Sequence, residues 1–86
     1  MAFNNTGPVT SIGPRQTLRW WYVRNGGADF GFQHAGADIK TPNCELIAFD
    51  QSKVLNANGT VTYFVSIRNT NSQLACLHNL QGGGAS

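Results

Sequence analysis

The chain has 86 residues, so it forms one small domain, and a chain of this length buries only roughly 60–65 % of its unfolded surface. Charged residues make up 12 % of the sequence and the net charge is +2, which is too weak to drive phosphate-dominated binding, so we do not expect a nucleic-acid partner. A hydrophobic content of 41 % excludes a disordered chain. The chain has no apolar run of the roughly 18 residues that a membrane-spanning helix needs.

The N-terminal half begins with residues 1–8, which are predicted to be an irregular arm because they show no periodicity. Residues 9–12 are consistent with a short edge strand that Gly13-Pro14 ends. Residues 16–24 alternate between two faces and are bounded by Asn25-Gly26-Gly27, which predicts a regular strand. Residues 29–40 also alternate, but they contain two glycines, so we expect an irregular strand there.

The C-terminal half contains the clearest strand of the sequence, residues 60–69, in which β-branched and aromatic side chains alternate over ten positions. Residues 45–49 and 53–55 are predicted to be two short strands ahead of it, and Asn58-Gly59 supplies the turn. A polar turn then leads to residues 74–80. We expect the last two strands to pair as an antiparallel meander, and residues 82–86 to form a flexible tail.

Six or seven short strands with frequent turn signals predict a single all-β domain, a small antiparallel β-sandwich of immunoglobulin-like or jelly-roll-like type. The pattern Tyr63-x-Val65-x-Ile67-x-Asn69, followed by a polar turn and another strand, is similar to the last hairpin of immunoglobulin-like adhesion modules. The similarity covers only the C-terminal third and implies architecture, not function. The Cys-Trp-Cys order of a true immunoglobulin domain is lacking, because both tryptophans precede both cysteines. The expected core contains Leu18, Trp20, Tyr22, Leu46, Val61, Tyr63, Val65 and Ile67.

Two cysteines, Cys44 and Cys76, lie 32 positions apart. Residues 1–14 lack the basic and apolar regions of a secretory signal, so we expect two free thiols that act as small apolar side chains. The alternative is a disulfide, which would constrain the unfolded chain by about 3.5 kcal/mol. The sequence does not decide the compartment.

Catalytic chemistry is poorly supported. The chain has four carboxylates, none at a spacing that would pair them predictably, and no nucleophile, zinc-protease or phosphate-loop motif occurs. We therefore predict no enzyme, no catalytic residue and no cofactor. A metal site would have to combine Cys76 and His78 with His34 or Cys44, but the usual zinc spacings are missing. We expect no metal, with Cys76 in the core and His78 at its polar rim.

The adjacent pair Trp20-Trp21 is the main functional signal, because neighbouring residues of a strand point to opposite faces. Leu18, Trp20 and Tyr22 form the more apolar set, so Trp21 and Arg19 are expected on the outward face. An exposed tryptophan favours a ligand or a partner.

We therefore expect a non-enzymatic, lectin-like binding module that recognises carbohydrate, with Trp21, Arg19 and Asn25 as contacts and several sites for avidity. The alternative is a structural protein that uses its outward aromatic residues, with Phe64 and Arg68, as a homo-oligomer interface.

Overall fold

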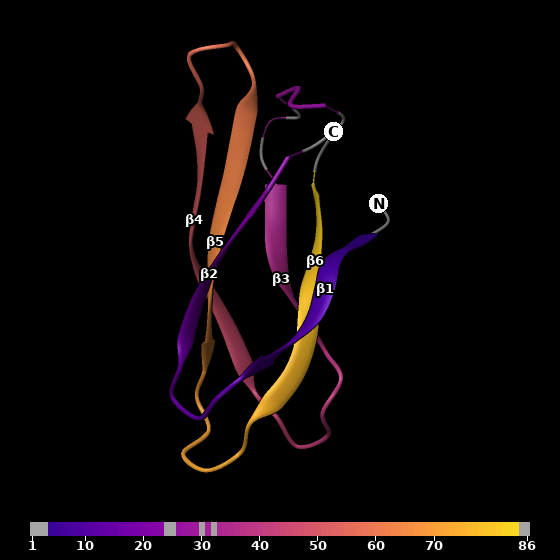
Figure 1. Cartoon of the computed structure of the whole chain (residues 1–86), viewed down its shortest axis with the longest axis vertical. Helices are drawn as coiled ribbons and strands as arrows, with labels where there is room; N and C mark the ends of the chain where they lie inside the picture. Colours follow the sequence, from indigo (N-terminus) through magenta and orange to yellow (C-terminus); the bar gives the residue numbers. More distant parts are fainter. Residues whose placement is uncertain (1–3, 24–25, 30, 32, 85–86) are drawn as a thin grey trace.

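The computed structural model describes residues 4–23, 26–29, 31 and 33–84. These residues form six strands in two three-stranded antiparallel sheets that lie against each other in a sandwich-like arrangement (Figure 1). One sheet has the order β1-β6-β3 and the other β2-β5-β4. The strands are β1 (Asn4–Ile12), β2 (Thr17–Tyr22), β3 (Gln33–Ile39), β4 (Leu46–Leu55), β5 (Val61–Asn69) and β6 (Cys76–Gly84). The all-β expectation is confirmed, and no helix able to cross a membrane occurs in this described part.

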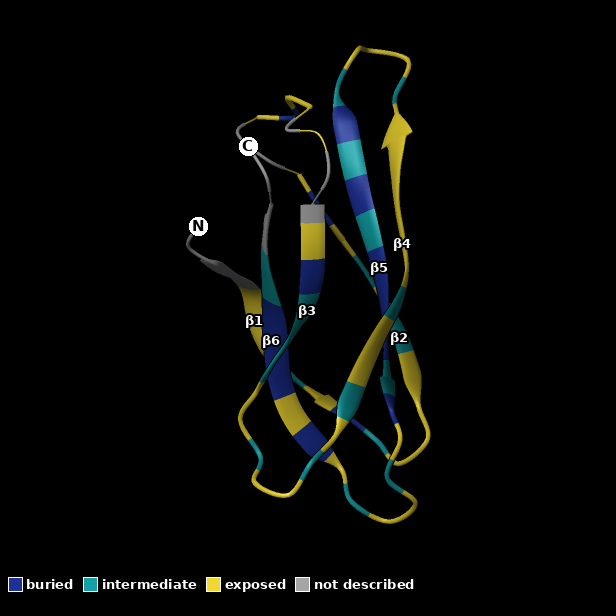
Figure 2. Cartoon of the chain, turned by 180° about the vertical axis from the view of Figure 1, so that it is seen from behind, coloured by how far each residue is buried: buried dark blue, intermediate teal, exposed yellow. Residues whose placement is uncertain are grey.

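Strand β5 supplies the centre of the core, as its alternation predicts. Val61, Tyr63, Val65 and Ile67 are all buried, and β5 lies between β2 and β4 (Figure 2). Each Å² of apolar surface that these side chains bury contributes about 25 cal/mol to the stability of the fold. This burial stabilises β5 between its two neighbours. The pattern of residues 60–69 therefore predicted both the strand and its buried face.

The other half of the core comes from the β1-β6-β3 sheet. Ile12, Ala35, Cys76 and Leu80 are buried there, and only Cys76 was expected in the core. Four expected core residues lie outside β5. Tyr22 is buried, whereas Leu18, Trp20 and Leu46 are only partly buried and pack against the core.

The predicted meander of residues 60–69 and 74–80 is wrong. Strands β5 and β6 lie in different sheets, and the link between them crosses from one layer to the other. The Asn69 side chain holds this crossing, because its amide donates to the carbonyl oxygens of Leu74 at 2.7 Å and Ile12 at 3.0 Å. These bonds tie the end of β1 and the segment just before β6 to the end of β5.

The two chain ends are more regular than expected. Strand β1 begins at Asn4, so residues 4–8 are not an irregular arm, and β6 continues to Gly84 through most of the expected tail. Pairing of β1 with β6 is interrupted by a bulge between Thr6 and Thr10. Gly7 has a φ of 76° there and passes beside the Trp20 ring. Gly7 therefore forms part of a bulge within the strand.

Residues 46–55 form one strand, not the two that were predicted. A bulge between Phe49 and Ser52 reverses the alternation, and Asp50 takes a positive φ of 53° there. Gln51, inside the bulge, accepts the backbone N–H of Ala35 on β3 at 2.7 Å. The β4–β5 hairpin projects beyond the other strands (Figure 1), which leaves Leu55 at its tip 73 % exposed.

Cys44 and Cys76 form a disulfide, so the expectation of two free thiols is wrong. Cys44 lies just before β4, and Cys76 begins β6 in the opposite sheet. The bond therefore joins the two layers, a contact between distant segments that spacing in the sequence does not reveal.

Candidate functional site

The outer face of the β2-β5-β4 sheet carries a group of aromatic and polar side chains that we call the Trp21 platform: Arg19, Trp21, Ser52, Phe64 and Ser66. Cross-strand register places Trp21 opposite Phe64 and Arg19 opposite Ser66. Trp21 is 66 % exposed, so it faces outward as alternation predicts, while Trp20 faces the core. An indole and a phenyl ring thus lie side by side on an open sheet surface.

Arg19 is held over this surface by three contacts. Its guanidinium donates to Ser66 Oγ at 3.1 Å and to Ser52 Oγ at 3.3 Å, and it lies 4.9 Å from the centre of the Phe64 ring. A guanidinium has five N–H donors. The serines and the ring therefore orient Arg19 while leaving N–H groups available at the surface.

The structure brings together Trp21 and Arg19, two of the three residues expected at the site. Asn25, the third, lies outside the described residues. Phe64 is part of the platform. Arg68 lies next to it, opposite Thr17, and donates to Thr17 Oγ1 at 3.2 Å. Alternation alone could have placed Ser66 on this face, but Ser52 arrives there only because of the β4 bulge.

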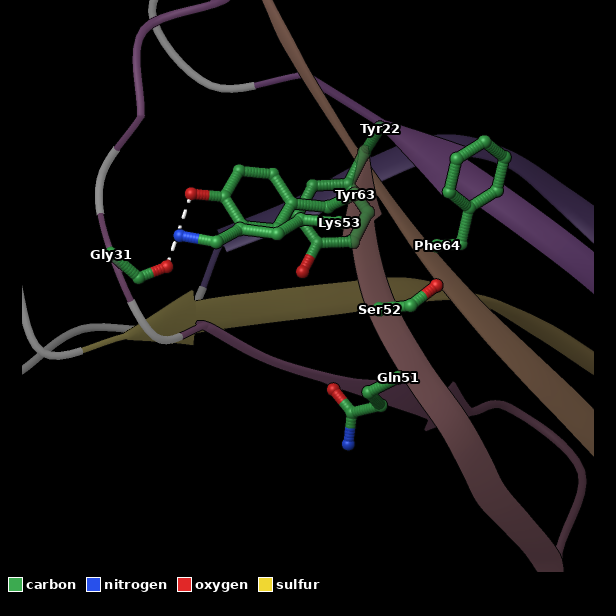
Figure 3. Close-up of a pocket in the computed structure, with 7 residues that line it drawn as sticks. All are labelled: Tyr22, Gly31, Gln51, Ser52, Lys53, Tyr63 and Phe64. Atoms are coloured by element: carbon green, nitrogen blue, oxygen red, sulfur yellow. Dashed lines mark hydrogen bonds between the residues drawn. The ribbon is translucent and has the colours of Figure 1, made fainter. Parts of the chain in front are cut away.

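A small pocket of about 130 Å³ lies at the edge of the platform (Figure 3). It is lined by Tyr22, Gly31, Gln51, Ser52, Lys53, Tyr63 and Phe64. Tyr22 and Tyr63 stack at 5.3 Å between ring centres, and the Tyr63 hydroxyl donates to the Gly31 carbonyl at 3.1 Å. Pockets that enclose small ligands usually measure about 300–1,000 Å³. This pocket is therefore too small to enclose a cofactor.

An ion pair lies close to the pocket. Lys53 Nζ contacts the Asp29 carboxylate at 3.0 Å, and Asp29 also accepts the Gly31 N–H at 2.8 Å. The Gly31 hydrogen bond, followed by Lys53, lowers the pKa of Asp29 from its usual value. The carboxylate form of Asp29 is therefore the one that Gly31 and Lys53 stabilise beside the pocket.

His78 is fully buried, so the expectation that it lies at a polar rim is wrong. Trp20 Nε1 donates to His78 Nε2 at 3.3 Å, and His78 Nδ1 lies 3.0 Å from the Thr10 carbonyl oxygen. Because an indole N–H can only donate, Nε2 accepts and Nδ1 carries the proton. Both ring nitrogens are thus engaged in the core.

The described part of the chain contains no cluster of metal-ligating side chains. No three His, Cys, Asp or Glu side chains lie close enough there to hold an ion. Cys44 and Cys76 are bonded to each other, which removes them as thiolate ligands.

No known family, characterised protein or solved structure matches this chain.

Proposed function

We propose that the protein is a non-enzymatic binding module that recognises carbohydrate on the Trp21 platform. The observation that carries this proposal is the 66 % exposure of Trp21 beside Phe64 and the oriented guanidinium of Arg19. The C–H face of a sugar ring packs on an indole, and fixed N–H and hydroxyl groups bond its hydroxyls. An open, weakly charged platform suits such a ligand better than it suits a charged one.

The test is a glycan array with the wild-type protein and the Trp21→Ala variant. Wild type is expected to bind a defined set of sugars, and Trp21→Ala to lose at least about tenfold in affinity, since stacked aromatic anchors dominate such contacts. Leu77→Ala is the matched control, because Leu77 is exposed on the other sheet and its loss should leave binding unchanged. No binding to any glycan, or equal binding by Trp21→Ala, would contradict the proposal.

The second candidate function is structural: a homo-oligomer that buries the same outer face against another copy. Three further apolar side chains favour it, since Val23, Ile47 and Val54 are exposed around or beyond the platform. Exposed apolar groups on one face are typical of interfaces. In that case Trp21→Ala would dissociate the oligomer, and no sugar would bind.

For the fold, we propose the immunoglobulin-like type over the jelly-roll type. The pairing of β2-β5-β4 and of β6 with β3 follows the order of strands B-E-D and F-C in immunoglobulin domains. Strand β1 would then take the place beside β6 that strand G has in those domains. A jelly roll needs eight strands.

A further inference from the structure

The four outer edges of the two sheets differ in how well they are protected from pairing with another chain. The edges of β3 and β4 lie near each other, and Gln51 of β4 binds the Ala35 N–H of β3. The edge strand β1 contains Pro8 and the Gly7 bulge. Proline, bulges and covering side chains are the usual protection of sheet edges.

Strand β2 has neither a proline nor a bulge. It is regular over Thr17–Tyr22 and contains no glycine. Its one charged side chain, Arg19, turns inward over the sheet to Ser66 and Ser52, away from the edge. Among the described strands only β5 pairs with β2, so its other edge has no strand partner, and β2 carries mostly apolar side chains.

The hydrogen-bond register shows which backbone groups point to this edge. The Asn69 N–H donates to the Gln16 carbonyl at 2.9 Å, so Gln16 and Asn69 form a hydrogen-bonded pair. Pairs alternate along antiparallel strands, so Leu18, Trp20 and Tyr22 bond to β5. Thr17, Arg19 and Trp21 direct their N–H and C=O groups away from β5, and no described strand pairs with them.

We propose that β2 pairs antiparallel with β2 of a second copy of this chain, forming a two-fold dimer with a continuous six-stranded sheet. The second copy is the occupant because the edge is self-complementary in one register. With Arg19 opposite Trp21 of the partner copy, every outward N–H from Thr17 to Val23 meets an outward carbonyl. That register also avoids placing the two Arg19 residues directly opposite each other, so no like charges face across the new pair of strands.

The dimer would set two Trp21 platforms side by side on one face of the joined sheet. Two linked shallow sites raise avidity without any new contact to the ligand. The edge pairing itself does not depend on what the platform binds, so it can hold or fail independently of sugar recognition.

The first measurement follows amide hydrogen exchange and, by sedimentation, the oligomeric state. The protein concentration runs from about 10 µM to about 1 mM, which spans the dissociation constants expected of a small interface. The amides of Arg19 and Trp21 should become protected as the dimer forms, whereas those of Leu18 and Trp20 are protected throughout by β5. A contact between the α-protons of Leu18 and Tyr22, which are too far apart within one strand, should appear in the dimer. A protein that stays monomeric, or a dimer with exchanging Arg19 and Trp21 amides, would overturn the proposal.

A matched pair of variants isolates the backbone contribution. Arg19→Ala and Arg19→Pro lose the same side chain, but only proline also removes the N–H at the edge, which the monomer does not use. Arg19→Ala should still dimerise and Arg19→Pro should remain monomeric, with Leu18 and Trp20 amides still protected. Equal dissociation of both variants would overturn the proposal. Trp21→Ala keeps the backbone and should still dimerise, which separates edge pairing from the face-to-face oligomer.

Discussion

At the scale of single residues, His78 places a titratable side chain inside the core. It is fully buried, and its two ring nitrogens bond to Trp20 on the opposite sheet and to Thr10 on β1. Burial lowers the pKa of His78 from its usual value, although the Thr10 carbonyl acts in the other direction. A proton on Nε2 would face the indole N–H, so the charged form loses the contact between the sheets.

The unfolding free energy should therefore fall as pH drops below about 6.5, the pKa of histidine in an unfolded chain. Because the folded pKa is lowered, the unfolded state binds more protons in that window, and stability changes by at most about 1.4 kcal/mol per pH unit. Urea unfolding between pH 5 and 8 measures this slope. Asp29, whose pKa is also lowered, contributes to the pH dependence of stability only below about 3.9, the ordinary pKa of aspartate.

The control for this slope is His78→Leu, whose side chain cannot take up a proton. This variant should be less stable overall and flat across the same range. Equal slopes in wild type and His78→Leu would show that the buried imidazole does not set the response.

At the scale of strands, the β4 bulge determines both the platform and the contact between the sheet edges. Gln51 accepts the Ala35 N–H at 2.7 Å from within the bulge. Gln51→Ala leaves this partly buried donor without its partner, which should lower the unfolding free energy by about 1 kcal/mol. Chemical denaturation measures the change, and Gln73→Ala, in an exposed turn, should leave it within about 0.5 kcal/mol. An unchanged midpoint for Gln51→Ala would contradict the role of this contact.

Strand alternation explains what could be predicted at this scale. Residues 60–69 and 16–24 alternate cleanly, so β5, β2 and the outward direction of Trp21 followed from the sequence. The bulge at Asp50 did not, because a non-glycine residue with positive φ leaves no signal in the pattern. Residues 46–55 therefore appeared as two strands, and Ser52 was missed as a neighbour of Arg19. Pairing of β6 with β1 and β3 depends on distant segments, which alternation within one strand cannot reveal.

At the scale of the whole molecule, the two thin layers are held together by few groups. The core of buried apolar residues is small, and polar links between the layers are made by Trp20 with His78 and by Asn69 with Ile12. The unfolding free energy of a protein domain is about 5–15 kcal/mol, and small domains lie at the low end of that range. A covalent link between the layers therefore contributes a large share of the total.

Loss of the Cys44–Cys76 bond should consequently lower the unfolding free energy by about 3–4 kcal/mol, because it closes a loop between residues 32 positions apart. Denaturant unfolding of the Cys44→Ala/Cys76→Ala protein measures the loss. Because the double variant has no disulfide to reduce, adding reductant to it shows any effect of the reductant itself on stability. Wild type under reducing conditions should match the double variant. Both cysteines also contact Asn71, whose amide lies 3.6 Å from Cys44 Sγ and 3.8 Å from Cys76 Sγ. A double variant as stable as wild type would mean that packing around Asn69 and Asn71, and not the covalent bond, joins the two sheets.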